Sequence, residues 1–96
     1  MIDVDEFRRH GWLVVPGALA TEQLAAPDRS VDELERWATT DGPGLHHFEQ
    51  TDAGAVIARS EDFVDHSSTL RSLICDGLVV EVLTERFGEA PVLFKE

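Results

Sequence analysis

Cysteine and long apolar stretches are both scarce in this sequence. The single cysteine, Cys75, cannot form an internal disulfide, and it stands in an apolar segment where free cysteine usually acts as a small core residue. We therefore expect a reducing compartment. No apolar run approaches membrane-spanning length, and the N-terminus lacks the basic start and apolar stretch of a signal peptide. The sequence thus predicts a cytoplasmic protein that does not contact a membrane.

Positive charge is scarce as well. Nineteen acidic residues against eight Lys and Arg give a formal net charge of -11 at pH 7. Because a surface of this sign repels phosphate backbones, we predict that nucleic acid is not a partner. The acids are scattered along the chain, which is typical of a solvated surface. With 43% hydrophobic residues in a chain of 96, the sequence predicts a compact but marginal core.

The N-terminal residues contain signals for a helix followed by a strand. Asp3 and Glu6 are spaced as a capping box, and Gly11 stands where a left-handed C-terminal residue is needed. These signals predict a helix over residues 4–10. The apolar residues 12–15 then predict a buried strand, because Pro and Gly follow them directly.

Proline interrupts the next helical segment. Thr21 is expected to cap a short helix through Leu24, and Pro27 should prevent its continuation. Ser30 and Glu33 form a second capping box, which predicts a new helix. The apolar face of that helix is predicted to consist of Val31, Leu34, Trp37 and Ala38.

The rest of the chain predicts a hairpin, two helices and a terminal strand. Residues 45–50 and 55–60 are separated by a tetrapeptide that contains glycine, which is typical of a β-hairpin. Helices are expected from Ser67 or Ser68 and over residues 78–87. Residues 90–96 have the pattern of a strand, and an unpaired strand invites association. We therefore expect self-association, or pairing with a further part of the protein, through this strand.

The hairpin sequence contains one candidate for a metal site. His47-Phe48-Glu49 matches the His-x-Glu pattern of a facial triad, and alternation along a strand places His47 and Glu49 on one face. A triad needs a second histidine, and His66 is the remaining downstream candidate. The alternative, which we favour, is that these groups line a partly exposed hairpin. The sequence accordingly predicts neither a metal site nor a catalytic residue here.

Three segments together resemble one enzyme family. They are Phe7 with residues 10–17, then residues 58–66, which include Val-Asp-His, and finally Leu93-Phe94-Lys95-Glu96. In this order the segments resemble the N-terminal part of the phytanoyl-CoA dioxygenase family of Fe(II)/2-oxoglutarate-dependent hydroxylases.

The resemblance implies an α+β fold in which N-terminal helices and a few strands belong to an incomplete double-stranded β-helix, a cupin-like jelly roll. Residues 1–96 would form the N-terminal fragment of that domain. In the family, the His-x-Asp ligands follow the position of Glu96, so the chain alone should be inactive and should need no cofactor. Fe(II), 2-oxoglutarate and a small-molecule substrate would bind in the complete enzyme.

The resemblance also bears on Lys95, the only lysine of the chain. Its strand borders the active site in the family, which implies a pocket contact by Lys95 in a complete protein. A lone lysine on a strand is more often simply exposed. A different class of function also stays open, namely a small acidic interaction or regulatory module that pairs through its terminal strand.

Overall fold

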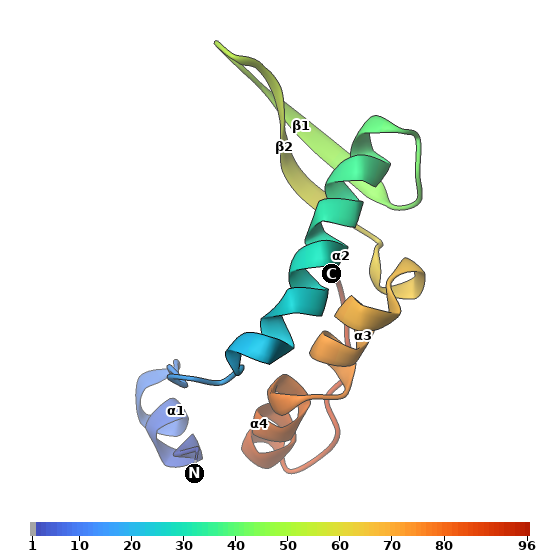
Figure 1. The fold of residues 1–96 in the computed structure, drawn as a ribbon. Helices are drawn as coiled ribbons and strands as arrows, with labels where there is room; N and C mark the ends of the chain where they lie inside the picture. The colour runs from blue at the N-terminus through green and yellow to red at the C-terminus, as the bar shows by residue number, and fades with distance from the viewer. Residues whose placement is uncertain (1) are drawn as a thin grey trace.

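The computed structural model describes residues 2–96, which form an α+β fold (Figure 1). Two strands make one antiparallel sheet, and the longest helix packs against the second strand. The elements in chain order are α1 (Val4–His10), α2 (Thr21–Thr39), β1 (Leu45–Thr51), β2 (Gly54–Glu61), the 3-10 helix η1 (Val64–His66), α3 (Ser68–Cys75) and α4 (Leu78–Phe87).

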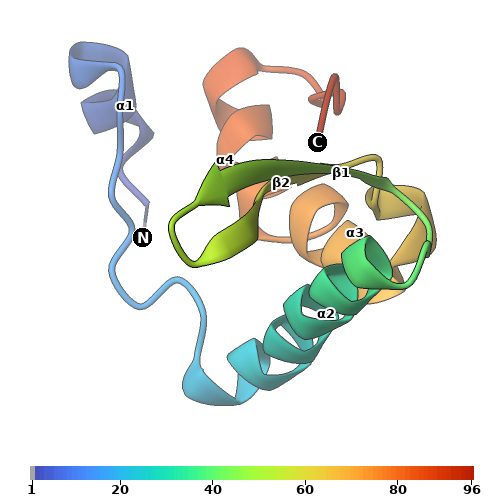
Figure 2. The ribbon, with the colours of Figure 1, turned by 90° about the horizontal axis from the view of Figure 1, so that it is seen from above.

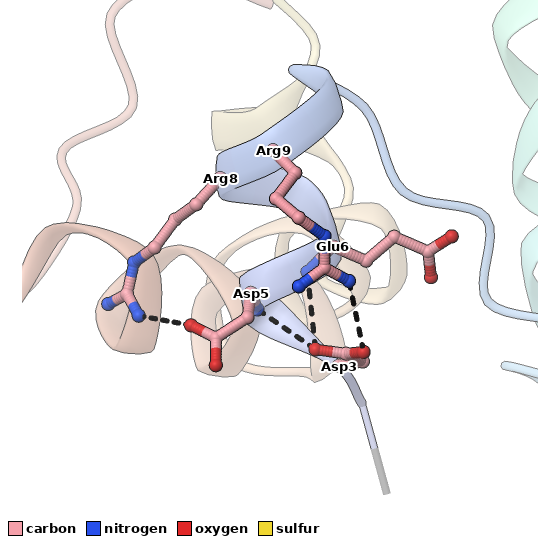
Figure 3. A network of polar contacts seen from close by, with 5 residues as sticks. All are labelled: Asp3, Asp5, Glu6, Arg8 and Arg9. Atoms are coloured by element: carbon pink, nitrogen blue, oxygen red, sulfur yellow. Dashed lines mark hydrogen bonds and ion pairs between the residues drawn. The ribbon is translucent and has the colours of Figure 1, made fainter.

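The predicted helix over residues 4–10 is confirmed as α1. The Asp3 carboxylate accepts hydrogen bonds from the backbone N–H groups of Asp5 and Glu6, at 3.0 and 3.2 Å. Gly11 ends the helix at φ 79°, the left-handed conformation that glycine adopts without strain. Figure 3 shows the Asp3 carboxylate at the start of the helix, with Arg9 and the Arg8–Asp5 ion pair beside it. The distance from Arg9 Nη2 to Asp3 Oδ2 is 3.7 Å.

The strand predicted over residues 12–15 is wrong. These residues pair with no strand of the described chain, and 59% of Trp12 and 68% of Val14 are exposed. Leu13 and Val15, which alternate with them, are half-buried and face α4. The segment therefore has the side-chain alternation of a strand but lacks a neighbouring chain to supply ladder hydrogen bonds.

The break predicted at Pro27 is also wrong, because α2 continues through it to Thr39. A proline inside a helix removes a hydrogen bond and costs about 3 kcal/mol. Packing offsets this cost, since the half-buried and buried residues of α2 recur on one face that contacts α3. That face consists of Ala26, Pro27, Ser30, Glu33, Leu34, Trp37 and Ala38. Leu34 is buried as expected, whereas Val31 is 47% exposed.

The hairpin and the two C-terminal helices are confirmed. Thr51 pairs with Gly54 across a two-residue turn, and Phe48 pairs with Ile57. The Ser67 hydroxyl accepts a hydrogen bond from the backbone N–H of Leu70 at 3.3 Å and so caps α3. Gly88 ends α4 in the left-handed conformation.

The strand predicted over residues 90–96 is wrong. No backbone–backbone hydrogen bond joins this segment to the rest of residues 2–96, so no ladder forms. Val92 is 89% exposed and Phe94 is 97% exposed. We refer to residues 92–96 as the C-terminal segment.

The core is small for a chain of this length. Within residues 2–96, the buried apolar side chains are Val4, Leu34, Val64 and Leu70, and none of the large side chains is fully enclosed. The radius of gyration is 16.1 Å, whereas a compact domain of this length is expected at about 12.5 Å. Figure 1 shows the cause, since the hairpin extends beyond the helices rather than folding back on them. No helix of the described chain is both long and apolar enough to cross a membrane.

Candidate functional site

Four charged or titratable side chains meet at the base of the hairpin, around the carboxylate of Glu61. The Arg59 Nε atom lies 2.8 Å and the Lys95 Nζ atom 3.5 Å from Glu61 Oε1. The His47 Nε2 atom lies 3.5 Å from Glu61 Oε2. We call His47, Arg59, Glu61 and Lys95 the Glu61 cluster.

The strand register brings the hairpin members of this cluster together. His47 pairs with Arg59, and Leu45 pairs with Glu61. Between the His47 and Phe48 pairs, β2 contains one extra residue, Ala58, which forms a β-bulge. Because a bulge shifts the side-chain alternation of its strand, Arg59 and Glu61 lie on the face of His47 rather than on the face of Phe48.

The C-terminal segment completes the cluster from a distant part of the sequence. Beside the Lys95 contact, the backbone N–H of Val64 donates a hydrogen bond to Glu96 Oε1 at 3.3 Å. Val64 is buried at the start of η1, so this contact is partly shielded from water. Figure 2 shows the C-terminus returning to the region of the hairpin after α4.

Glu61 is the least exposed member of the cluster, with 15% of its side chain accessible. Burial alone would raise the pKa of its carboxyl group. The positive charges of Arg59 and Lys95, with hydrogen bonds from Lys95 and His47, outweigh burial and lower the pKa below its ordinary value of 4.5. Glu61 is therefore a carboxylate at neutral pH.

The His47-x-Glu49 pair does not gain a third ligand. His47 and Glu49 occupy alternate positions of β1, but His47 contacts Glu61, and His66 lies against the Trp37 ring at 6.5 Å between centroids. Within residues 2–96, no three His, Cys, Asp or Glu side chains converge closely enough to hold a metal ion. These residues do not fit an iron site, and we assign no chemical step to them through iron.

The neighbouring His46 is directed differently. Its Nδ1 atom lies 2.9 Å from the Ser60 hydroxyl, and its Nε2 atom lies 2.9 Å from the Pro43 carbonyl. Both ring nitrogens are thus occupied by contacts that fix the start of β1. Adjacent positions on a strand face opposite sides, which separates His46 from the Glu61 cluster.

An open apolar groove of about 630 Å³ lies between α2, α3 and α4. Its lining includes Leu19, Pro27, Leu73, Leu78 and Val79, with few polar groups. Cys75 is half-buried in an adjoining apolar cavity beside Ile74 and Leu93. The residues that line this cavity include no basic side chain, so they give no support to nucleophilic catalysis by Cys75.

The chain is similar to two bacterial enzymes, a hydroxylase and a dioxygenase. It is 28% identical over 93 residues to methylphosphonate hydroxylase from Gimesia maris, covering 97% of this chain and 36% of that protein. It is 29% identical over 94 residues to 2-aminoethylphosphonate dioxygenase from the uncultured bacterium HF130_AEPn_1, covering 95% of this chain and 36% of that protein. The chain therefore spans about a third of the length of these relatives. No protein-family model matches it, and no solved structure does either.

Sequence reasoning did not single out Arg59 and Glu61 as interacting residues, although both lie in a segment that carries the family resemblance. An Arg-x-Glu pattern on a strand indicates that both side chains share a face. Their meeting with His47 depended on the bulge, and their meeting with Lys95 depended on the path of the chain after α4. Neither could be predicted from local patterns.

Proposed function

We propose that this chain is the N-terminal portion of a hydroxylase of the phytanoyl-CoA dioxygenase type, which uses Fe(II) and 2-oxoglutarate. The observation that carries the proposal is the similarity over nearly the whole chain to two enzymes, one named a hydroxylase and the other a dioxygenase. The order of the family-like segments supports it. The proposed complete fold is a cupin-like jelly roll, and the proposed location is the cytoplasm.

The substrate class we propose is an organophosphonate. Both similar enzymes are named for phosphonates, one for a methyl and one for an aminoethyl compound. The two compounds carry substituents of different polarity, and the phosphonate group is common to both. Recognition of the phosphonate group is therefore the simplest requirement that the two enzymes share. In the complete enzyme, we propose that Lys95 contacts a ligand in the pocket, because a lysine ammonium can pair with anionic oxygen.

The 96-residue chain by itself should be inactive. It should be incubated with Fe(II), ascorbate, 2-oxoglutarate and methylphosphonate, and succinate should be measured. We expect no succinate above the reaction without protein, because the described residues do not converge into an iron site. Succinate formation that depends on the chain would contradict the proposal.

The coding sequence beyond Glu96 gives an independent test. We expect a His-x-Asp or His-x-Glu motif soon after this point, followed by a distal histidine and an arginine. A continuation without such a motif would remove the basis for the iron-dependent activity. The similarity to the two phosphonate enzymes would then reflect a shared fold without the iron-dependent activity.

A second function of a different class is favoured by one observation, the exposure of Val92 and Phe94 in a segment that makes no backbone–backbone hydrogen bond to the rest of residues 2–96. Such a segment is suited to strand addition in an interaction module. Sedimentation of the chain tests the pairing itself. A concentration-dependent dimer that is lost in Phe94→Ser would favour pairing through the segment, and a monomer over the accessible range would count against it.

A further inference from the structure

The position of the C-terminal segment depends on side chains rather than on its backbone. No ladder hydrogen bond holds this segment to the rest of the described chain, and Val92 and Phe94 point into solvent. Its polar anchors are the Lys95–Glu61 ion pair and the hydrogen bond from Val64 N–H to Glu96. Two consecutive residues are therefore attached at two neighbouring points, the end of β2 and the start of η1.

Glu61 is suited to be the fixed member of the Lys95 ion pair. Its side chain is far less exposed than those of Arg59 and Lys95, which are 61% and 66% accessible. Its backbone is held in the hairpin opposite Leu45. The flexible lysine therefore adapts to a carboxylate whose position is already set by the strand register.

Arg59 competes with Lys95 for the same atom. Both cations approach Glu61 Oε1, at 2.8 Å for Arg59 and 3.5 Å for Lys95, while His47 approaches Oε2. Because both cations share Glu61 Oε1, the shorter Arg59 contact weakens the Lys95 contact. Removing Arg59 should therefore strengthen the Lys95 contact, whereas removing the Glu61 charge should abolish it.

We propose that Glu61 is a positioning residue for Lys95: its carboxylate fixes where the Lys95 ammonium lies and thereby keeps the C-terminal segment beside the base of the hairpin. The role of Lys95 as a ligand contact rests on the proposed function. The positioning itself is a property of the chain alone. It can therefore be tested without iron, 2-oxoglutarate or turnover, and its failure is distinguishable from failure of the enzymatic proposal.

The single lysine provides a direct probe. Reductive methylation with ¹³C-formaldehyde labels the Lys95 amine and retains its positive charge, and the labelled N-terminal amine resonates separately. In the unsubstituted chain, we expect a Lys95 methyl signal displaced from that of a free dimethyl-lysine. Glu61→Gln should return the signal to the free position, and Glu61→Asp should restore part of the displacement.

Glu49→Gln is the matched control, because it removes one carboxylate from the same hairpin at a position outside the cluster. It should leave the Lys95 signal displaced. The cross-strand contact between Phe48 and Ile57 reports whether each variant keeps the hairpin. A Lys95 signal that stays displaced in a folded Glu61→Gln chain would overturn the proposal.

Arg59→Met covers the case in which Glu61→Gln does not fold. Because it frees the shared oxygen, we expect the Lys95 signal to move further from the free position, and an unchanged signal would contradict the proposal.

Amide exchange at Val64 is a second readout. In Glu61→Gln it should become about two- to fivefold faster, the range expected for losing a partly exposed ion pair. An unchanged rate would contradict the proposal, because the Glu96 contact would then form without Glu61.

Discussion

The hairpin and the C-terminal segment have similar strand-forming sequences, but only the hairpin forms a ladder. In the hairpin, the two-residue turn between Thr51 and Gly54 brings the strands close together. Each strand therefore supplies the hydrogen-bond partners of the other. The C-terminal segment has apolar residues of the same kind, but it makes no backbone–backbone hydrogen bond to the rest of residues 2–96. The difference teaches that strand propensity becomes a strand only where a second chain segment lies within hydrogen-bond reach.

The largest expected effect concerns the packing of α3, which contacts α2, α4 and η1. Leu70→Ala removes one of the few buried side chains, which is 6% exposed. We expect a loss of about 2–3 kcal/mol in the free energy of unfolding, the lower part of the range for such truncations, because the loose core can relax around the cavity. Urea unfolding measures it. Val92→Ala, at an exposed position, is the control and should change stability by less than about 0.5 kcal/mol.

A second substitution should break the hairpin selectively. Gly54 has φ 108° at the end of the turn, a conformation that side chains adopt only under strain. Gly54→Val should therefore destabilise the hairpin by about 1–3 kcal/mol. Amide exchange in β1 and β2 measures this loss, with Ala55→Val as the neighbouring control. Equal protection in both variants would mean that the turn does not limit hairpin stability.

Acid should release the C-terminal segment without separating the strands. The lowered pKa of Glu61 means that its contribution is fully present above its ordinary value of 4.5 and is lost as the pH falls through the lowered pKa. The signal of ¹³C-dimethyl Lys95 should move to the free position in that acidic range, while the contact between Phe48 and Ile57 persists. In Glu61→Gln this transition should be absent. Simultaneous loss of both signals would indicate that the two regions unfold together.

The smallest expected effect is that of Phe94→Ser on folding. This side chain is 97% exposed, so its removal should change the free energy of unfolding by less than about 0.5 kcal/mol. Thermal unfolding at low protein concentration checks this. A clear loss of stability would show that Phe94 packs on the chain in solution, and the contrast between the hairpin and the C-terminal segment would then be smaller.

Several elements could be predicted because their signals are local. The cap at Asp3, the glycines at 11 and 88, and the turn before Gly54 each satisfy hydrogen bonds or backbone angles within a few residues. The failures at Pro27 and at residues 12–15 have another origin. In the first, packing on α3 outweighed the local cost of proline, and in the second no neighbouring strand was present.

The candidate site was predictable only in part. The sequence indicates that His47 and Lys95 are chemically capable side chains, but it does not indicate their common partner, because their separation along the chain exceeds the reach of any local pattern. The bulge at Ala58 decided which face Arg59 and Glu61 occupy. A single extra residue reverses that choice, so the pairing register has to be known first.

The sequence by itself determined where the confirmed helices begin and end, the hairpin and the acidic character of the surface, because capping, turn geometry and charge depend on adjacent residues. The tertiary structure alone decided that α2 runs through Pro27, that the last residues form no strand, and that Lys95 meets Glu61. These outcomes depend on which distant segments come into contact, and the free energy of such contacts is not encoded at any one position.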